Sequence, residues 1–145
     1  MGVHEHTVTA TVDPKIVWER WTNTDLWPVD DPDCEKAMLN GPLAKGALGW
    51  VKPKKGFRSS FRIVEVNRQK MRFGIESKLP LGTMRFEHFL DKVEGEEDTA
   101  EREMTHRVTI TGPLAKVWDR LVGRPIAEGL PTVMGNIVRV ASLGE

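Results

Sequence analysis

The spacing of apolar residues changes once along this chain, and that change constrains the fold more than any other feature. Up to Gly112-Pro113, apolar residues mostly alternate with polar ones, which is typical of half-buried β-strands. Beyond that dipeptide, Leu114, Val117 and Leu121 begin a spacing of three and four residues, which is typical of an amphipathic helix. The pattern predicts a β-sheet followed by a C-terminal helix.

The alternating part divides into short segments separated by turn residues. Short turns between consecutive strands favour antiparallel pairing. In one segment the apolar parity shifts between Ile63 and Val64, which indicates a β-bulge that would curve the sheet. The expected strands are 3–12, 34–40, 47–52, 57–67, 71–75, 84–90 and 100–110.

Helices are expected at two places. Asp13-Pro14 offers an N-cap and a proline at the first helical position, so a short helix should run to about residue 23, followed by a second short turn through Trp27. In the last third, glycines and prolines interrupt the helical pattern, which predicts a short helix, a break near 123–125 and a kinked helix to about residue 142. The expected fold is α+β: a single domain, 1–145, in which a curved antiparallel sheet of about six or seven strands grips a long kinked C-terminal helix, with two short helices after the first strand.

Composition excludes several classes of function. Lys+Arg and Asp+Glu both number 21, and this balance argues against a nucleic-acid binder, which needs a basic excess. No apolar run approaches the roughly 20 residues of a membrane-spanning helix. The single cysteine, Cys34, excludes an intramolecular disulfide and fits a reducing compartment, so we expect a cytoplasmic protein without an integral membrane segment.

Three stretches and the order of elements resemble a known superfamily. Residues 12–18 (VDPKIVW), 40–46 (NGPLAKG) and 105–115 (THRVTITGPLA), the last followed by Trp118, are similar to the SRPBCC superfamily (START-like, helix-grip), which includes the birch pollen allergen type. The likeness is greatest to the bacterial polyketide cyclase/dehydrase branch. The resemblance implies binding of a hydrophobic small molecule or lipid between helix and sheet, and some members catalyse ring closure or dehydration there.

Two histidines are the candidate catalytic residues. His88 and His106 lie on the apolar parity of consecutive strands. A hairpin centred on Gly95 would place His88 opposite Arg102 or Met104, and His106 opposite Met84 or Phe86. Two imidazoles and Arg102 would then point into one cavity and orient or polarise a carbonyl, with histidine as general acid or base. The competing interpretation is a pair of buried histidines bonded only to their neighbours.

Other chemistries lack support in the sequence. His4 and His6 are spaced as two metal ligands can be, but no carboxylate is evidently placed to orient them. Cys34 lies in an acidic run that should raise its pKa and make it a poor nucleophile. No glycine-rich phosphate loop and no G-x-S-x-G motif occurs. We therefore expect neither a metal nor a cofactor.

The leading prediction is binding, transport or sequestration of a hydrophobic or amphipathic small molecule or lipid in a cavity between sheet and helix. The alternatives are a cyclase or dehydratase that uses His88 or His106, and a protein-interaction module of the lipid-chaperone or antitoxin-like kind with an exposed patch around Trp27. Homodimerisation stays open. The predicted ligand-binding residues are Trp21, Trp27, Trp50, Phe73, Met84, Phe86, Arg102, Met104, Leu130 and Met134.

Overall fold

The computed structural model describes residues 2–95 and 99–143. Seven strands form one antiparallel sheet in the order β1-β7-β6-β5-β4-β3-β2. The strands are β1 (Gly2–Thr11), β2 (Cys34–Asn40), β3 (Leu48–Pro53), β4 (Ser59–Asn67), β5 (Arg72–Leu79), β6 (Gly82–Lys92) and β7 (Glu101–Thr111). Each predicted strand is present, and the register between β4 and β5 shifts between Ile63 and Glu65, where the bulge was expected.

The helices before β2 follow the predicted signals. Asp13 caps α1 (Pro14–Thr22), and its carboxylate accepts a 2.9 Å bond from the backbone nitrogen of Lys15. A 3-10 turn, η1 (Thr24–Leu26), and the short α2 (Trp27–Asp30) follow. Arg20 donates to Asp30 at 3.1 Å and joins α1 to α2.

The C-terminal helical segment is continuous. It consists of α3 (Ala115–Trp118), a π-helical turn η2 (Asp119–Gly123) and α4 (Arg124–Ala141). The predicted break near 123–125 is therefore wrong. Pro125 lies in the first turn of α4, where a missing N–H is tolerated, and the irregularity is taken up by the π turn just before it. Pro131 lies inside α4.

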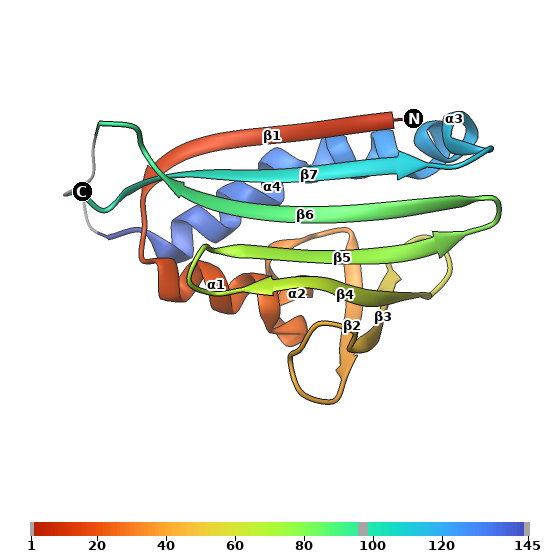
Figure 1. Ribbon diagram of the computed structural model, residues 1–145, viewed down its shortest axis with the longest axis horizontal. Coiled ribbons are helices and arrows are strands. Elements are labelled where there is room, and N and C mark those ends of the chain that lie inside the picture. Colours follow the sequence, from red (N-terminus) through yellow and green to blue (C-terminus); the bar gives the residue numbers. More distant parts are fainter. Residues whose placement is uncertain (1, 96–98, 144–145) are drawn as a thin grey trace.

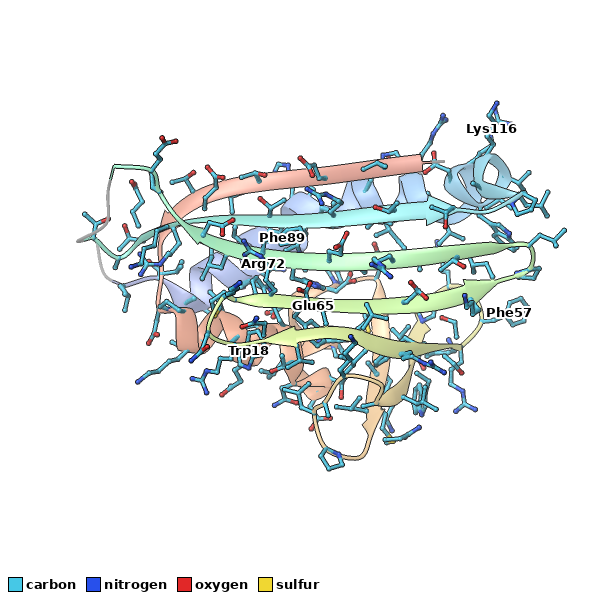
Figure 2. All side chains as sticks on the ribbon, viewed as in Figure 1. Trp18, Phe57, Glu65, Arg72, Phe89 and Lys116 are labelled. Atoms are coloured by element: carbon cyan, nitrogen blue, oxygen red, sulfur yellow. The ribbon has the colours of Figure 1, made fainter. Side chains whose placement is uncertain are left out.

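The helices lie on one side of the sheet (Figure 1). α4 packs against β1 and β7, and α1 and α2 pack against α4 below the other half of the sheet. The opposite face of the sheet is outward and largely charged; there, Phe89 lies beneath the guanidinium groups of Arg72 and Arg107, at 4.9 and 5.0 Å (Figure 2). None of the described helices is long and apolar enough to cross a membrane.

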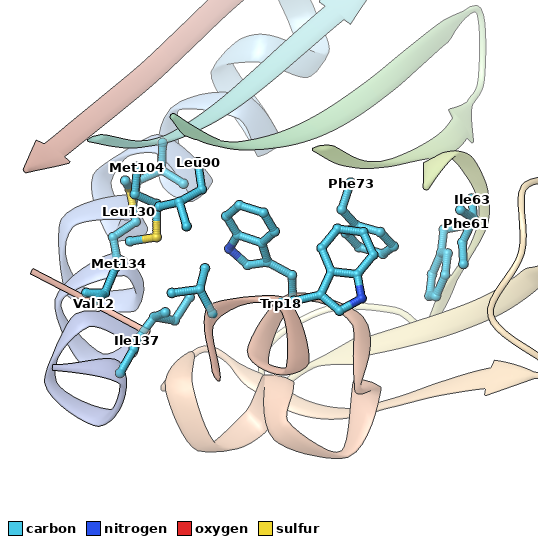
Figure 3. Packing of buried hydrophobic residues seen from close by; sticks show 13 residues of the cluster. Val12, Trp18, Phe61, Ile63, Phe73, Leu90, Met104, Leu130, Met134 and Ile137 are labelled. Atoms are coloured by element: carbon cyan, nitrogen blue, oxygen red, sulfur yellow. The ribbon is translucent and has the colours of Figure 1, made fainter. Parts of the chain in front are cut away.

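The core lies between the sheet and the helices as two clusters. The larger one joins Trp18, Trp21 and Phe73 to the α4 residues Leu130 and Met134 (Figure 3). The smaller one contains Val108, Ile110 and Ala115 near α3. Half-buried Phe86 packs against both clusters. Phe86 therefore lies where the two clusters meet and keeps part of its surface accessible.

Candidate functional site

The two predicted histidines face each other directly. His88 of β6 pairs with His106 of β7, and Lys92 pairs with Arg102, so the hairpin is centred at position 97. The predicted pairing of His88 with Arg102 or Met104, and of His106 with Met84 or Phe86, is wrong by a shift of a few residues. The cause is that β6 ends at Lys92 and β7 begins at Glu101, so the centre of the pairing falls two positions beyond Gly95.

A row of aromatic side chains crosses the inner face at this level. His6 of β1 pairs with His106, His106 with His88, and His88 with Phe73 of β5. Residues paired directly across antiparallel strands point to the same face. Because His106 and Phe73 are buried under the helices, the whole row faces the core side.

His106 has one satisfied and one unsatisfied ring nitrogen. The indole nitrogen Nε1 of Trp21 donates to His106 Nε2 at 3.0 Å. An indole N–H can only donate, so Nε2 carries no proton and the neutral ring holds its proton on Nδ1. The side chain is 1% exposed, and Nδ1 has no hydrogen-bond partner within the described residues. His106 therefore presents a buried donor without an acceptor.

His88 has the complementary arrangement. Its Nδ1 lies 3.0 Å from the carbonyl oxygen of Phe73, and a carbonyl can only accept, so Nδ1 holds the proton. Among the described residues no donor bonds to Nε2, so its lone pair is free. The ring stacks on Phe86 at 4.9 Å and lies edge-to-face with His106 at 4.5 Å between centroids. An acceptor and a donor therefore lie on two rings in contact.

Both imidazoles are neutral near pH 7. Burial lowers the pKa of His88 to about 4, although the bond to Phe73 opposes the shift. Burial, followed by repulsion from His88 and His6, lowers the pKa of His106 well below its ordinary value. Protonation of His106 at Nε2 would also place two N–H donors against each other at Trp21. The two rings can bind or polarise a ligand group through hydrogen bonds. Neither is an imidazolium at neutral pH, so neither can act there as a charged proton donor.

The surroundings of the histidine pair are apolar and incompletely covered. Because α4 packs on β1 and β7, Val108 and Ile110 of β7 are buried. Their neighbours across β6 and β5 are only half-buried, among them Met84, Phe86 and Ile75. On α4, Ile126 and Val133 are half-buried as well. Apolar surface therefore stays accessible beside the two imidazoles.

The other predicted ligand residues divide into three groups. Trp21, Phe73, Met104, Leu130 and Met134 are core residues. Trp27 is half-buried, packs its ring on Phe61 at 5.4 Å and donates to the carbonyl of Trp21 at 3.0 Å. Trp50 and Arg102 do not reach the histidine pair.

Trp50 lies on the outer face of the sheet. It pairs with Ser60, whereas the neighbouring Gly49 pairs with buried Phe61 on the inner face. The guanidinium of Arg58 lies 4.8 Å over its ring. Placing Trp50 in the ligand site is a wrong prediction, because Gly49 and not Trp50 provides the inward position on β3.

Arg102 is the second residue of β7, four residues before His106 and roughly 13 Å from it along the strand. Its Nη1 donates to the carbonyls of Thr99 and Glu101 at 2.8 and 3.0 Å. It lines a separate pocket of about 500 Å³ at the β4–β5 turn, with Arg68, Lys70 and Leu90. The prediction that Arg102 shares a cavity with both imidazoles is therefore wrong.

The remaining candidates have structural partners. His4 Nε2 lies 2.7 Å from Asp119 Oδ1, a carboxylate from the π turn that the sequence did not suggest. The described residues contain no group of three or more metal-ligating side chains. Cys34 is buried, and burial, followed by the charge of Asp31, raises its pKa to about 11. This is the expected direction.

A seven-stranded antiparallel sheet that holds a long C-terminal helix on one face defines the helix-grip class of folds. No family model and no curated protein matches this chain. Solved structures do. A hypothetical protein from Helicobacter pylori has a TM-score of 0.78 at 10% identity, covering 97% of this chain and 88% of that one.

Two further structures carry functional names. The di-domain ARO/CYC protein BexL of the BE-7585A biosynthetic pathway has a TM-score of 0.72 at 14% identity, covering 94% of this chain and 46% of that one. Norcoclaurine synthase from Thalictrum flavum, solved with dopamine and hydroxybenzaldehyde, has a TM-score of 0.64 at 14% identity, with coverages of 96% and 85%. The chain thus has the helix-grip fold, as predicted, and at these identities the likeness shows the fold alone.

Proposed function

We propose that this protein binds a neutral hydrophobic or amphipathic small molecule or lipid on the inner face of the sheet, beside α4, for transport or sequestration. The apolar part of the ligand would contact Met84, Phe86 and Ile75, which are half-buried around the histidine pair. We further propose that residues 1–145 act as one cytoplasmic domain. Homodimerisation stays a prediction.

The observation that carries this proposal is the unpartnered Nδ1 of His106. A buried donor without an acceptor costs about 1–3 kcal/mol, and a ligand oxygen would remove this cost. A neutral oxygen suits the site best, because a carboxylate would bring an unpaired charge into apolar surroundings. A hydroxyl group is especially suitable, since it can accept from His106 Nδ1 and donate to His88 Nε2.

The enzymatic alternative is a cyclase or dehydratase that uses His88 or His106 as general acid or base. Its support is the free Nε2 of His88 and the names of two structures with this fold. However, a histidine with a pKa of about 4 is a weak base and is not protonated at neutral pH. Binding, with polarisation of the bound oxygen, is therefore the preferred proposal.

The interaction-module alternative receives less support. It rested on an exposed apolar patch around Trp27, but Trp27 is half-buried and bonded through its indole nitrogen. Only Val29 beside it is strongly exposed. A single exposed valine is ordinary for a protein surface.

A matched pair of substitutions on β6 tests ligand binding. Met84→Trp fills the accessible inner face, whereas Arg85→Trp adds the same side chain to the outer face. The probe is N-phenyl-1-naphthylamine, whose fluorescence rises in apolar surroundings, with myristyl alcohol as competitor. We expect Met84→Trp to weaken probe binding by about tenfold or more and Arg85→Trp to leave it unchanged.

Recognition of the ligand oxygen needs a second comparison. His106→Phe should weaken competition by myristyl alcohol more than binding of the probe, because only the alcohol uses Nδ1. Native mass spectrometry of protein purified from its own host would identify a retained ligand. Absence of probe binding to the wild type, or an equal loss in Met84→Trp and Arg85→Trp, would refute the proposed site.

A further inference from the structure

Five large apolar side chains are exposed together at one end of the sheet. Phe57 is 94% exposed, Leu81 65% and Leu121 61%. We call this set the apolar tip; its members are Phe57, Leu81, Leu114, Val117 and Leu121. Single exposed apolar residues are common on proteins, but a group of this size at one end is typical of an interaction surface.

The strand register explains why separate loops meet there. β4 begins at Ser59 and pairs Arg62 with Glu76, which places Ser59 level with Leu79 at the end of β5. The loop that carries Phe57 and the turn that carries Leu81 therefore leave the sheet at the same end (Figures 1 and 2).

The α3 region is fixed to the same turn. The backbone nitrogen of Leu114 donates to the carbonyl of Leu81 at 3.0 Å, and the indole of Trp118 donates to the carbonyl of Pro80 at 2.7 Å. Leu114, Val117 and Leu121 follow helical spacing and are all exposed. Of these three residues, Leu114 lies next to Leu81 through the backbone bond.

Leu81 is unfavourable for folding in two ways. Its φ is +53°, a left-handed conformation that costs a non-glycine residue about 1 kcal/mol or more. Its side chain also faces solvent. Glycine or asparagine would suit this turn better, so the turn itself does not require a leucine.

The apolar tip is surrounded by cations. The β3–β4 loop contributes Lys55 and Arg58, and the α3–η2 segment contributes Lys116 and Arg120. No salt bridge within the described residues involves these four side chains. Lys52, Lys78 and Arg124 at this end are paired with Glu35, Glu76 and Asp119, at 3.5, 3.9 and 3.8 Å, and Lys54 lies near Asp31. The exposed carboxylate of Asp33 lies beside the β3–β4 loop, where the backbone carbonyl oxygen of Asp33 accepts from the backbone nitrogen of Lys54 at 2.9 Å. The four unpaired cations outnumber it, so the balance of unpaired charge at the apolar tip is positive, in a chain whose formal charge is zero.

We propose that the apolar tip docks onto an anionic membrane surface. Exposed phenylalanine and leucine side chains would enter the boundary between headgroups and acyl chains, while lysine and arginine would contact anionic headgroups. The charge complementarity favours an anionic bilayer over a second copy of the chain, because two copies joined through this end would bring like charges together. The proposal concerns peripheral binding and is independent of the ligand site.

The test is flotation of the purified full-length chain with vesicles of phosphatidylcholine, alone or mixed with phosphatidylglycerol. We expect binding to the mixed vesicles and a decrease with added salt. Phe57→Ser and Leu81→Gly should each weaken binding by about tenfold. Val140→Ser serves as control, because Val140 is also exposed (42%) but lies near the C-terminal end of α4.

Charge is tested separately. Lys55→Glu with Lys116→Glu should abolish binding, whereas Lys70→Glu, in the β4–β5 turn at the opposite end, should not. Leu81→Gly also distinguishes docking from folding, because removing the strained leucine should keep or raise the free energy of unfolding while binding is lost. Failure of wild-type protein to float with mixed vesicles would overturn the proposal. So would a dimer, seen by light scattering, that Phe57→Ser dissociates.

Discussion

Acidification should destabilise this protein through the buried histidine pair, well above the pH at which ordinary carboxylates titrate. The pKa of His88 in the folded chain is about 4, and the ordinary value is about 6.5. Between these two values the unfolded chain binds the proton and the folded chain does not. The contribution of His88 to the free energy of unfolding is therefore fully present above pH 6.5, and it is lost as the pH decreases toward 4.

The size of the effect follows from the shift. One pKa unit corresponds to 1.36 kcal/mol, so His88 alone accounts for a loss of about 3 kcal/mol between pH 6.5 and 4. His106 acts in the same direction, since its pKa is also lowered by burial. With both groups neutral in the folded state, the slope should approach about 2.7 kcal/mol per pH unit.

The assay is urea unfolding followed by tryptophan fluorescence, at intervals between about pH 7.5 and 5. His88→Phe should keep the stack on Phe86 and remove one bound proton, which halves the slope. Buried Asp30, whose pKa is raised by burial, contributes with the opposite sign. The contribution of Asp30 to the pH slope is the same in His88→Phe and in wild type, so it cancels when the two slopes are compared.

Two results would refute this reasoning. One is an identical pH slope in His88→Phe and wild type. The other is a His88 ring signal that titrates near pH 6.5 in an NMR titration of the folded protein. Either would mean that the ring is solvated, and the argument for a neutral donor–acceptor pair would fail with it.

Three further predictions concern single side chains. Trp21→Phe should lower the free energy of unfolding by about 2–4 kcal/mol in urea, because it leaves His106 Nε2 buried without a donor and opens a void in the core. Gly49→Ala should cost about 2 kcal/mol or more by the same measurement, because a Cβ at this position would overlap the carbonyl oxygen of Met38 and the ring of Phe61. Cys34, with its pKa raised to about 11, should react with iodoacetamide at about pH 8 roughly 100-fold more slowly than an ordinary thiol, and urea should restore the rate.

The strands were predictable because their signals are local. Cys34–Asn40 was predicted with the bounds that β2 has, and the parity shift at Ile63 located the bulge. The register of β6 against β7 was not predictable in the same way. This register depends on the position about which the two strands are paired. Gly95 predicted a centre at position 95, whereas the pairing is centred at position 97. A shift of this size keeps both histidines on the inner face but changes the partner of each one.

The sequence misplaced some site residues because their positions depend on contacts with residues that are distant in the sequence. The sequence predicts Trp50 as a ligand-binding residue, but the ring of Phe61 on β4 occupies the inner side of β3 and requires glycine at position 49. Arg102 has the inward parity that was predicted, yet it lies too far along β7. The bond from Trp21 to His106 had no local signal at all, because it joins residues 85 positions apart.

The proposed ligand site and the proposed membrane-docking surface require different properties of the molecule. The histidine pair is neutral and favours an uncharged oxygen, whereas the balance of unpaired charge at the apolar tip is positive and favours an anionic surface. A neutral ligand that leaves a membrane would therefore pass the cations of the apolar tip without binding them, and the anionic lipids would stay in the membrane. If the two sites cooperate in this way, Phe57→Ser should slow transfer of a neutral lipid alcohol from mixed vesicles without changing its affinity in solution. Met84→Trp should do the opposite: it should lower the affinity in solution while flotation with vesicles is unchanged.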